Sequence, residues 1–134
     1  MFRCSISDPL KPDPIEMGAI EREKILDILD RFPWNDLMNK MKGVDESVIH
    51  YSPTLEVENE VNHHLISISM VLDKENQFNI FYSRPKTVTS FFGLIKNTDD
   101  NFYSEREGQS HNEIRDAVHA LVTDDLQTLE KRWG

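Results

Sequence analysis

Histidine and cysteine are the residues with the most specific chemistry in this sequence, and their spacing does not predict a metal site. His63 and His64 are adjacent, so on a strand they point to opposite faces. His111 and His119 lie more than two turns apart on a predicted helix, and Cys4 is the only cysteine. We therefore predict no metal and no cofactor, and we expect the purified protein to contain no stoichiometric zinc.

Glycine spacing excludes the common phosphate-binding and nucleophile loops. Glycine occurs only at positions 18, 43, 93, 108 and 134. No two of these are close enough for a dinucleotide-binding turn, a P-loop or a G-x-S-x-G elbow. The sequence therefore favours a protein without catalysis, although it does not exclude a small enzyme.

Three glutamates, Glu56, Glu58 and Glu60, alternate with other residues along one stretch of the chain. On a strand, residues two apart share a face and lie about 7 Å from each other. Such a row can meet a basic partner or bind a hard cation, and it is also how a sheet keeps its outer face hydrated. We interpret it as a solvated acidic strand that a basic partner could contact.

Residues 76–98 contain no Asp or Glu, although the chain has 24 of them. Basic side chains interleaved with aromatic rings can stack on single-stranded nucleic acid or line a pocket for an anion. The formal net charge of −9 opposes nucleic acid, so we predict no nucleic-acid partner. The candidate binding residues are Phe81, Arg84, Lys86, Phe91, Glu56, Glu58 and Glu60.

Two functional hypotheses follow from these residues. The first is a non-catalytic binding or interaction domain that uses a sheet face or the acidic strand against a protein partner. The second is a small enzyme or small-molecule-binding protein whose pocket is assembled from separate loops. Its candidate residues are His50, Tyr51, His63, His64, Arg84 and Tyr103.

The elements that would position these residues begin with helices. Residues 1–12 show no periodic pattern and predict an irregular lead-in. Asp13, Pro14 and Glu16 resemble the start of a helix, which apolar spacing of three and four residues extends to Phe32. A second short helix is predicted at 36–42, with Gly43 after its end.

Alternation of apolar and polar residues then predicts an antiparallel meander. Arg84 and Pro85 are expected to end its third strand. The four to five predicted strands lie at about 54–61, 65–72, 78–83, 87–95 and, briefly, 102–104.

A capping box at Ser110 and Glu113 opens a long C-terminal helix that we expect to run to about Lys131. The predicted fold is a single α+β domain over residues 1–134, in which N-terminal helices and this helix pack on the meander. One sheet face then carries apolar residues that the helices do not reach. They are Leu65, Val71, Phe81, Phe91 and Ile95.

These five residues must be covered, either by the first helix or by association. A twofold homodimer would cover them with one patch that serves both copies. The formal charge of −9 would oppose dimerisation at low salt. The lone cysteine and the absence of a long apolar stretch predict a cytoplasmic protein without a membrane partner.

Overall fold

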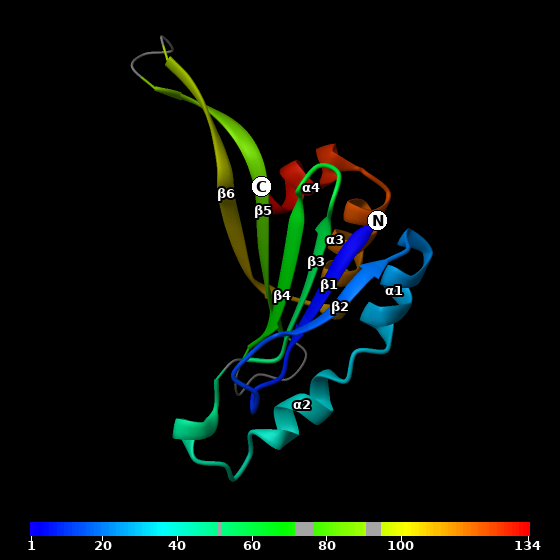
Figure 1. The fold of residues 1–134 in the computed structure, drawn as a ribbon, viewed down its shortest axis with the longest axis vertical. Coiled ribbons are helices and arrows are strands. Elements are labelled where there is room, and N and C mark those ends of the chain that lie inside the picture. The colour runs from blue at the N-terminus through cyan, green and yellow to red at the C-terminus, as the bar shows by residue number, and fades with distance from the viewer. Residues whose placement is uncertain (51, 72–76, 91–94) are drawn as a thin grey trace.

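The fold is α+β, with one antiparallel sheet of six strands and four α-helices (Figure 1). The computed structural model describes residues 1–50, 52–71, 77–90 and 95–134, with the backbone alone for 86–90 and 95–101. The strands are β1 (Phe2–Ser7), β2 (Ile15–Ile20), β3 (Thr54–Asn59), β4 (Leu65–Met70), β5 (Phe78–Ser90) and β6 (Ile95–Gln109). The helices are α1 (Arg22–Asp30), α2 (Trp34–Lys40), a 3₁₀ turn η1 (Glu46–Val48), α3 (His111–Val122) and α4 (Leu126–Trp133).

The strand order is β2-β1-β3-β4-β5-β6, and every pair is antiparallel. The first two predicted strands, 54–61 and 65–72, pair as the antiparallel hairpin of β3 and β4, with Glu56 opposite Ser67. The first of these strands ends at Asn59 rather than at Val61, because the Asn59 side chain accepts a hydrogen bond from the Val61 N–H and turns the chain.

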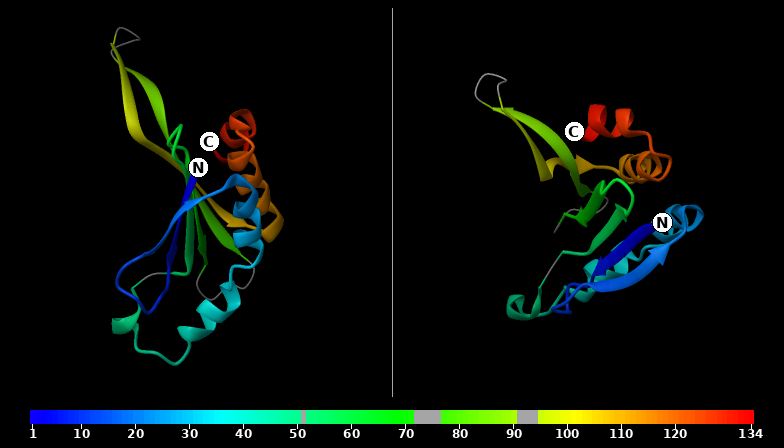
Figure 2. Two further views of the ribbon diagram at one scale, coloured as in Figure 1. Left: turned by 45° about the vertical axis from the view of Figure 1, so that its right-hand side comes forward. Right: turned by 45° about the horizontal axis from the view of Figure 1, so that its top comes forward.

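All four α-helices lie on one side of the sheet (Figure 2, left). The residues that alternate inward on β4 and β5 are 0–1% exposed and form the centre of the core, from Ile66 to Tyr82. α3 supplies Ile114, Val118 and Leu121 to the same core. The opposite side of the sheet, which we call the open face, has no α-helix of the described chain on it.

The N-terminal segment was predicted wrongly as an irregular lead-in. β1 pairs with both β2 and β3, and its side chains alternate, so that Phe2 and Cys4 are 2% and 1% exposed. Because β3 lies more than fifty residues further along the chain, the pairing that stabilises β1 is not visible in the local sequence.

The predicted helix start at Asp13 and Pro14 is also wrong. Residues 15–20 form β2, and Gly18 has a φ of 77°, which a helix does not accept. The helix begins at Arg22 instead, after Glu21, whose side chain makes no capping hydrogen bond. The second helix is confirmed with a small shift, since it covers 34–40 instead of 36–42.

Pro85 does not end the third predicted strand. β5 runs through it, and the register against β6 shifts between Arg84 and Lys86, which pair with Phe102 and Asp99. A proline lacks the N–H that a regular ladder needs, so it is tolerated where pairing is irregular. The fourth and fifth predicted strands are therefore the end of β5 and two parts of β6. These two strands are much longer than their neighbours, and their hairpin extends beyond the sheet (Figure 1).

The C-terminal helix was predicted correctly at its start and wrongly in its length. Ser110 and Glu113 make both hydrogen bonds of the capping box. The helix stops at Val122, Asp124 takes a φ of 57°, and Asp125 caps a separate helix by accepting from the Thr128 N–H. The turn lets α4 fold back against β5 and β6 instead of leaving the sheet.

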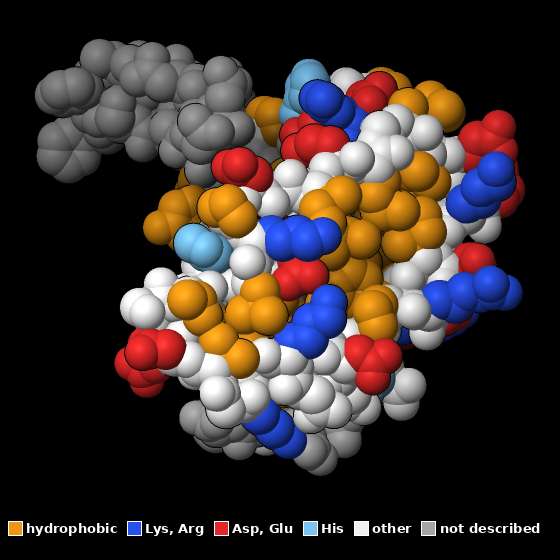
Figure 3. All heavy atoms as spheres, turned by 60° about the horizontal axis from the view of Figure 1, so that its bottom comes forward, with side chains coloured by type: hydrophobic (Ala, Val, Ile, Leu, Met, Phe, Trp, Pro, Cys, Tyr) orange, Lys and Arg blue, Asp and Glu red, His pale blue; other side chains and the backbone are white. Residues whose placement is uncertain are grey.

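The surface mixes charges of both signs with apolar side chains. Seen from the end that carries α2, hydrophobic side chains reach the surface among Lys, Arg, Asp and Glu side chains (Figure 3). Although the net charge is −9, this end of the molecule carries both acidic and basic side chains.

Candidate functional site

The open face presents its side chains in rows that cross the sheet, because residues paired between antiparallel strands lie side by side. The first row reads Glu16, Ser5, Glu56, Ser67, Phe81 and Glu105. The second reads Ala19, Arg3, Glu58, Leu65, Ser83 and Tyr103.

Carboxylates dominate the half of the open face that β2 and β3 form. Glu56 accepts a hydrogen bond from the Ser5 hydroxyl at 3.3 Å. Glu60, one residue beyond β3, lies 3.7 Å from the guanidinium of Arg3, and both side chains are exposed. Together with Glu58, these residues occupy one face, as the alternation predicted. Glu16, which the sequence did not single out, joins them from β2 around a shallow depression of about 180 Å³.

Aromatic side chains occupy the other half of the open face. The rings of Phe81 and Tyr103 stack with centroids 4.7 Å apart and planes 24° apart. Tyr103 is 59% exposed, whereas Phe81 is half-buried. Glu105 lies directly across the ladder from Phe81, so a carboxylate borders the stacked pair.

The predicted uncovered apolar patch is present in part. Leu65, Val71 and Phe81 are half-buried side chains outside the core. Phe91 lies outside the described residues, and the side chains of Ile95 and Lys86 are likewise not described. The described part of the patch is therefore Leu65, Val71 and Phe81, and Tyr103 stacks on Phe81.

An amide oxygen on the open face has no hydrogen-bond donor. Asn79 follows Ser69 across the ladder, and its Oδ1 is the one side-chain polar atom within the described residues that is sealed from solvent without a partner. A buried acceptor of this kind costs about 1–3 kcal/mol when it stays unpaired.

Arg84 does not belong to the open face. It points to the helix side, is 2% exposed, and forms two hydrogen bonds with the Glu130 carboxylate of α4 at 3.1 and 2.9 Å. Its remaining nitrogen donates to the Tyr82 carbonyl and to the Ser104 hydroxyl. The guanidinium also lies over the rings of Tyr82 and Phe102. The predicted grouping of Arg84 with Phe81 is thus divided between the two faces of the sheet.

Tyr82, whose ring lies beside the Arg84 guanidinium, also forms a hydrogen bond with His64. The Tyr82 hydroxyl oxygen lies 2.6 Å from the His64 Nδ1. Burial raises the pKa of Tyr82 to about 12. Burial, together with the positive charge of Arg84, lowers the pKa of His64 below 6.5. This hydrogen bond joins His64, the residue before β4, to Tyr82 on β5.

Among the described residues named for a loop-assembled pocket, some lie on each face of the sheet. His64 and Arg84 both contact Tyr82, whereas Tyr103 lies on the opposite face. His63 occupies the hairpin turn with a φ of 61°. Tyr51 lies outside the described residues. Sequence reasoning missed Glu130, although an arginine at an inward position of the β5 alternation indicates that hydrogen-bond acceptors must surround it.

No arrangement of metal ligands is found in the described part of the chain, where no three His, Cys, Asp or Glu side chains could hold an ion together. None of the described helices is long and apolar enough to cross a membrane. No protein-family model, curated protein or solved structure matches this chain.

Proposed function

We propose that this protein is a non-catalytic binding domain whose open face takes a basic segment of a partner protein. The observation that carries the proposal is the stacked pair of Phe81 and Tyr103, which is exposed beside carboxylates on a face without a helix. Aromatic anchors with a polar rim are the usual composition of a protein interface.

The chemistry of the face favours a partner rich in hydrogen-bond donors. Glu16, Glu56, Glu58 and Glu105 are acceptors, and the only basic residue in their two rows is Arg3. Lysine or arginine side chains would pair with these groups, and a neighbouring apolar or aromatic side chain would pack on Phe81 and Tyr103.

A homodimer through the same face is the second candidate, and the charges of the face oppose it. Two copies, each with a net charge of −9, repel each other at low salt whichever halves a twofold axis brings together. Sedimentation at low and high salt tests this candidate directly. If a dimer forms, strengthens with salt and is lost in Tyr103→Asp, the open face binds a second copy of the chain and not a basic partner.

Binding to peptide probes tests the proposal itself. Peptides that combine lysine and arginine with one aromatic residue, and acidic peptides of the same length, are titrated by fluorescence anisotropy. We expect only the basic peptides to bind, with an affinity that falls as salt is added. Tyr103→Ala should weaken binding by about tenfold or more, as expected for an interface anchor.

A matched set of charge variants locates the interaction. The double variant Glu56→Gln/Glu58→Gln should weaken binding and reduce its salt dependence. Glu23→Gln, on the exposed surface of α1, removes one charge on the helix side and should leave binding unchanged. Equal affinity for basic and acidic peptides, or equal effects of the two sets of substitutions, would refute the proposal.

A further inference from the structure

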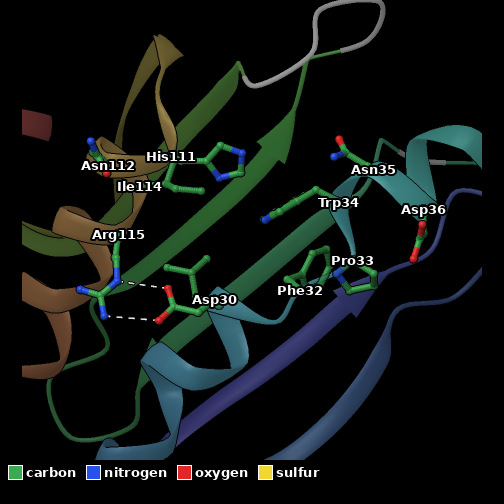
Figure 4. A pocket seen from close by; sticks show the side chains of 11 residues that line it. Asp30, Phe32, Pro33, Trp34, Asn35, Asp36, His111, Asn112, Ile114 and Arg115 are labelled. Carbon is green, nitrogen blue, oxygen red and sulfur yellow. Dashed lines mark hydrogen bonds and ion pairs between the residues drawn. The ribbon is translucent and has the colours of Figure 1, made fainter.

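A cavity of about 410 Å³ opens on the helix side, between the turn that joins α1 to α2 and the first turn of α3 (Figure 4). Its volume falls within the roughly 300–1,000 Å³ that is usual for small-molecule sites. Phe32 and Trp34, with ring centroids 4.2 Å apart, supply an aromatic wall, and Ile114 adds apolar surface. The cavity is separate from the open face, because the residues that line it belong to the helix side of the sheet.

One polar group in this cavity lacks a partner. Trp34 is 5% exposed, yet its indole N–H makes no hydrogen bond with any described residue. Figure 4 shows the indole nitrogen directed across the cavity toward Ile114 and Asp30. The other tryptophan, Trp133, follows the usual rule for a buried indole, since its N–H donates to the Gln109 side chain at 3.0 Å. The Trp34 N–H is therefore available to donate a hydrogen bond to a molecule in the cavity.

Charged groups of both signs line this cavity. His111 and Asn112, the first residues of α3, line the cavity, so the positive end of a twelve-residue helix faces it. Arg115 lies on the same wall and holds Asp30 through two hydrogen bonds of 3.1 and 3.3 Å. The other carboxylate of the lining, Asp36, is on the far side from Arg115 (Figure 4).

We propose that this cavity binds a small aromatic carboxylate. The ring would pack against Phe32 and Trp34, and one carboxylate oxygen would accept the Trp34 N–H. The other oxygen would approach the start of α3 and compete with Asp30 for Arg115. Because the guanidinium side chain is 50% exposed and its partner 47% exposed, the ion pair can open without disturbing the core.

Three ligands with the same ring and different charges test the proposal. They are 2-naphthoate, its neutral amide and 2-naphthylmethylamine. Each is titrated into the full chain labelled with ¹⁵N, in which Trp34 and Trp133 give two indole resonances. We expect 2-naphthoate to shift the Trp34 resonance with saturation in the millimolar range or tighter, while Trp133 stays in place. The cation should bind at least tenfold more weakly.

Two substitutions in the ion pair should have opposite effects on naphthoate affinity. Asp30→Asn removes the competing carboxylate and should strengthen binding several-fold. Arg115→Gln should weaken it by about tenfold, the size of one charge-assisted hydrogen bond. Arg132→Gln, in a similarly exposed ion pair with Asp116, is the control and should have no effect.

Any of four results would overturn the proposal. They are tighter binding of the amine than of the carboxylate, a shift of Trp133 without Trp34, no saturable shift up to the solubility limit, and equal affinities in Asp30→Asn and Arg115→Gln. Trp34→Phe assigns the Trp34 indole resonance, because that resonance disappears in the variant. The variant should also bind 2-naphthoate more weakly than the parent protein. If that variant does not fold, the two ion-pair variants still decide, because both side chains are at the surface.

Discussion

Removing the carboxylate of Glu130 tests how α4 is held against the sheet. In Glu130→Ala, the guanidinium of Arg84 stays in a site where its side chain is 3% exposed, but it loses both charge-assisted hydrogen bonds. Its contacts with the Tyr82 carbonyl and the Ser104 hydroxyl remain. The variant therefore leaves a buried positive charge with neutral partners alone.

The size of the effect follows from burial on the two sides of the pair. Breaking a fully buried ion pair costs about 3–5 kcal/mol. The Glu130 side chain is 43% exposed, so water can enter and hydrate part of the guanidinium after the substitution. Discounting for this solvent access, we expect the free energy of unfolding to fall by about 2–3 kcal/mol.

A double-mutant cycle in urea measures this interaction. Arg84→Met removes the charge but keeps an unbranched apolar side chain over Tyr82 and Phe102. Once the arginine is absent, the loss of Glu130 should cost little, so the double variant should be more stable than the sum of the single changes by about 2 kcal/mol. Asp116→Ala breaks the exposed ion pair with Arg132 and serves as the control, with an expected cost below about 1 kcal/mol.

Additive effects of Arg84→Met and Glu130→Ala would refute this reasoning, because they would show that the two side chains do not stabilise each other. A Glu130→Ala variant no less stable than Asp116→Ala would refute it as well. Added salt separates the two pairs further, since it should screen the exposed pair and leave the buried one nearly unchanged.

Three other predictions concern stability and reactivity. Ser110→Ala should lower the free energy of unfolding by about 1 kcal/mol through loss of the capping box. Thermal denaturation checks this, and a midpoint temperature equal to that of the parent protein would contradict it. Cys4 is 1% exposed and burial raises its pKa to about 11, so a thiol reagent at neutral pH should label it only as fast as the protein unfolds; labelling in the dead time would be inconsistent. Burial lowers the pKa of His64 below 6.5, so the unfolded chain binds a proton at a pH where the folded chain does not, and stability should fall as the pH drops from 6.5. Urea unfolding at several pH values should show a smaller fall in His64→Gln, and an unchanged pH dependence would exclude this origin.

Local signals predicted those elements whose partners are close in the chain. The alternation around Glu56 and Ser67 placed a hairpin that needs only a short turn, and its register follows from the chain itself. Ser110 and Glu113 determine a helix start because the hydrogen bonds that they satisfy lie within four residues. The acidic row on one strand face follows from the same alternation, since the period of a strand is two.

Other features depend on contacts that sequence spacing does not contain. Residues 15–20 form a strand because β1 lies beside them, and β1 is in turn held by β3, with Phe2 opposite Asn59. A helical cap and a turn before a strand use the same residue types, so Asp13 and Pro14 could not distinguish these outcomes.

The sequence by itself determined that glutamates share a strand face and that an aromatic, carboxylate-free segment follows them. The tertiary structure decided which side of the sheet the helices cover, and hence that Tyr103 is exposed while Arg84 is buried against Glu130. The physical reason is that alternation divides a strand into two faces, but only packing between distant segments decides which of them is removed from water.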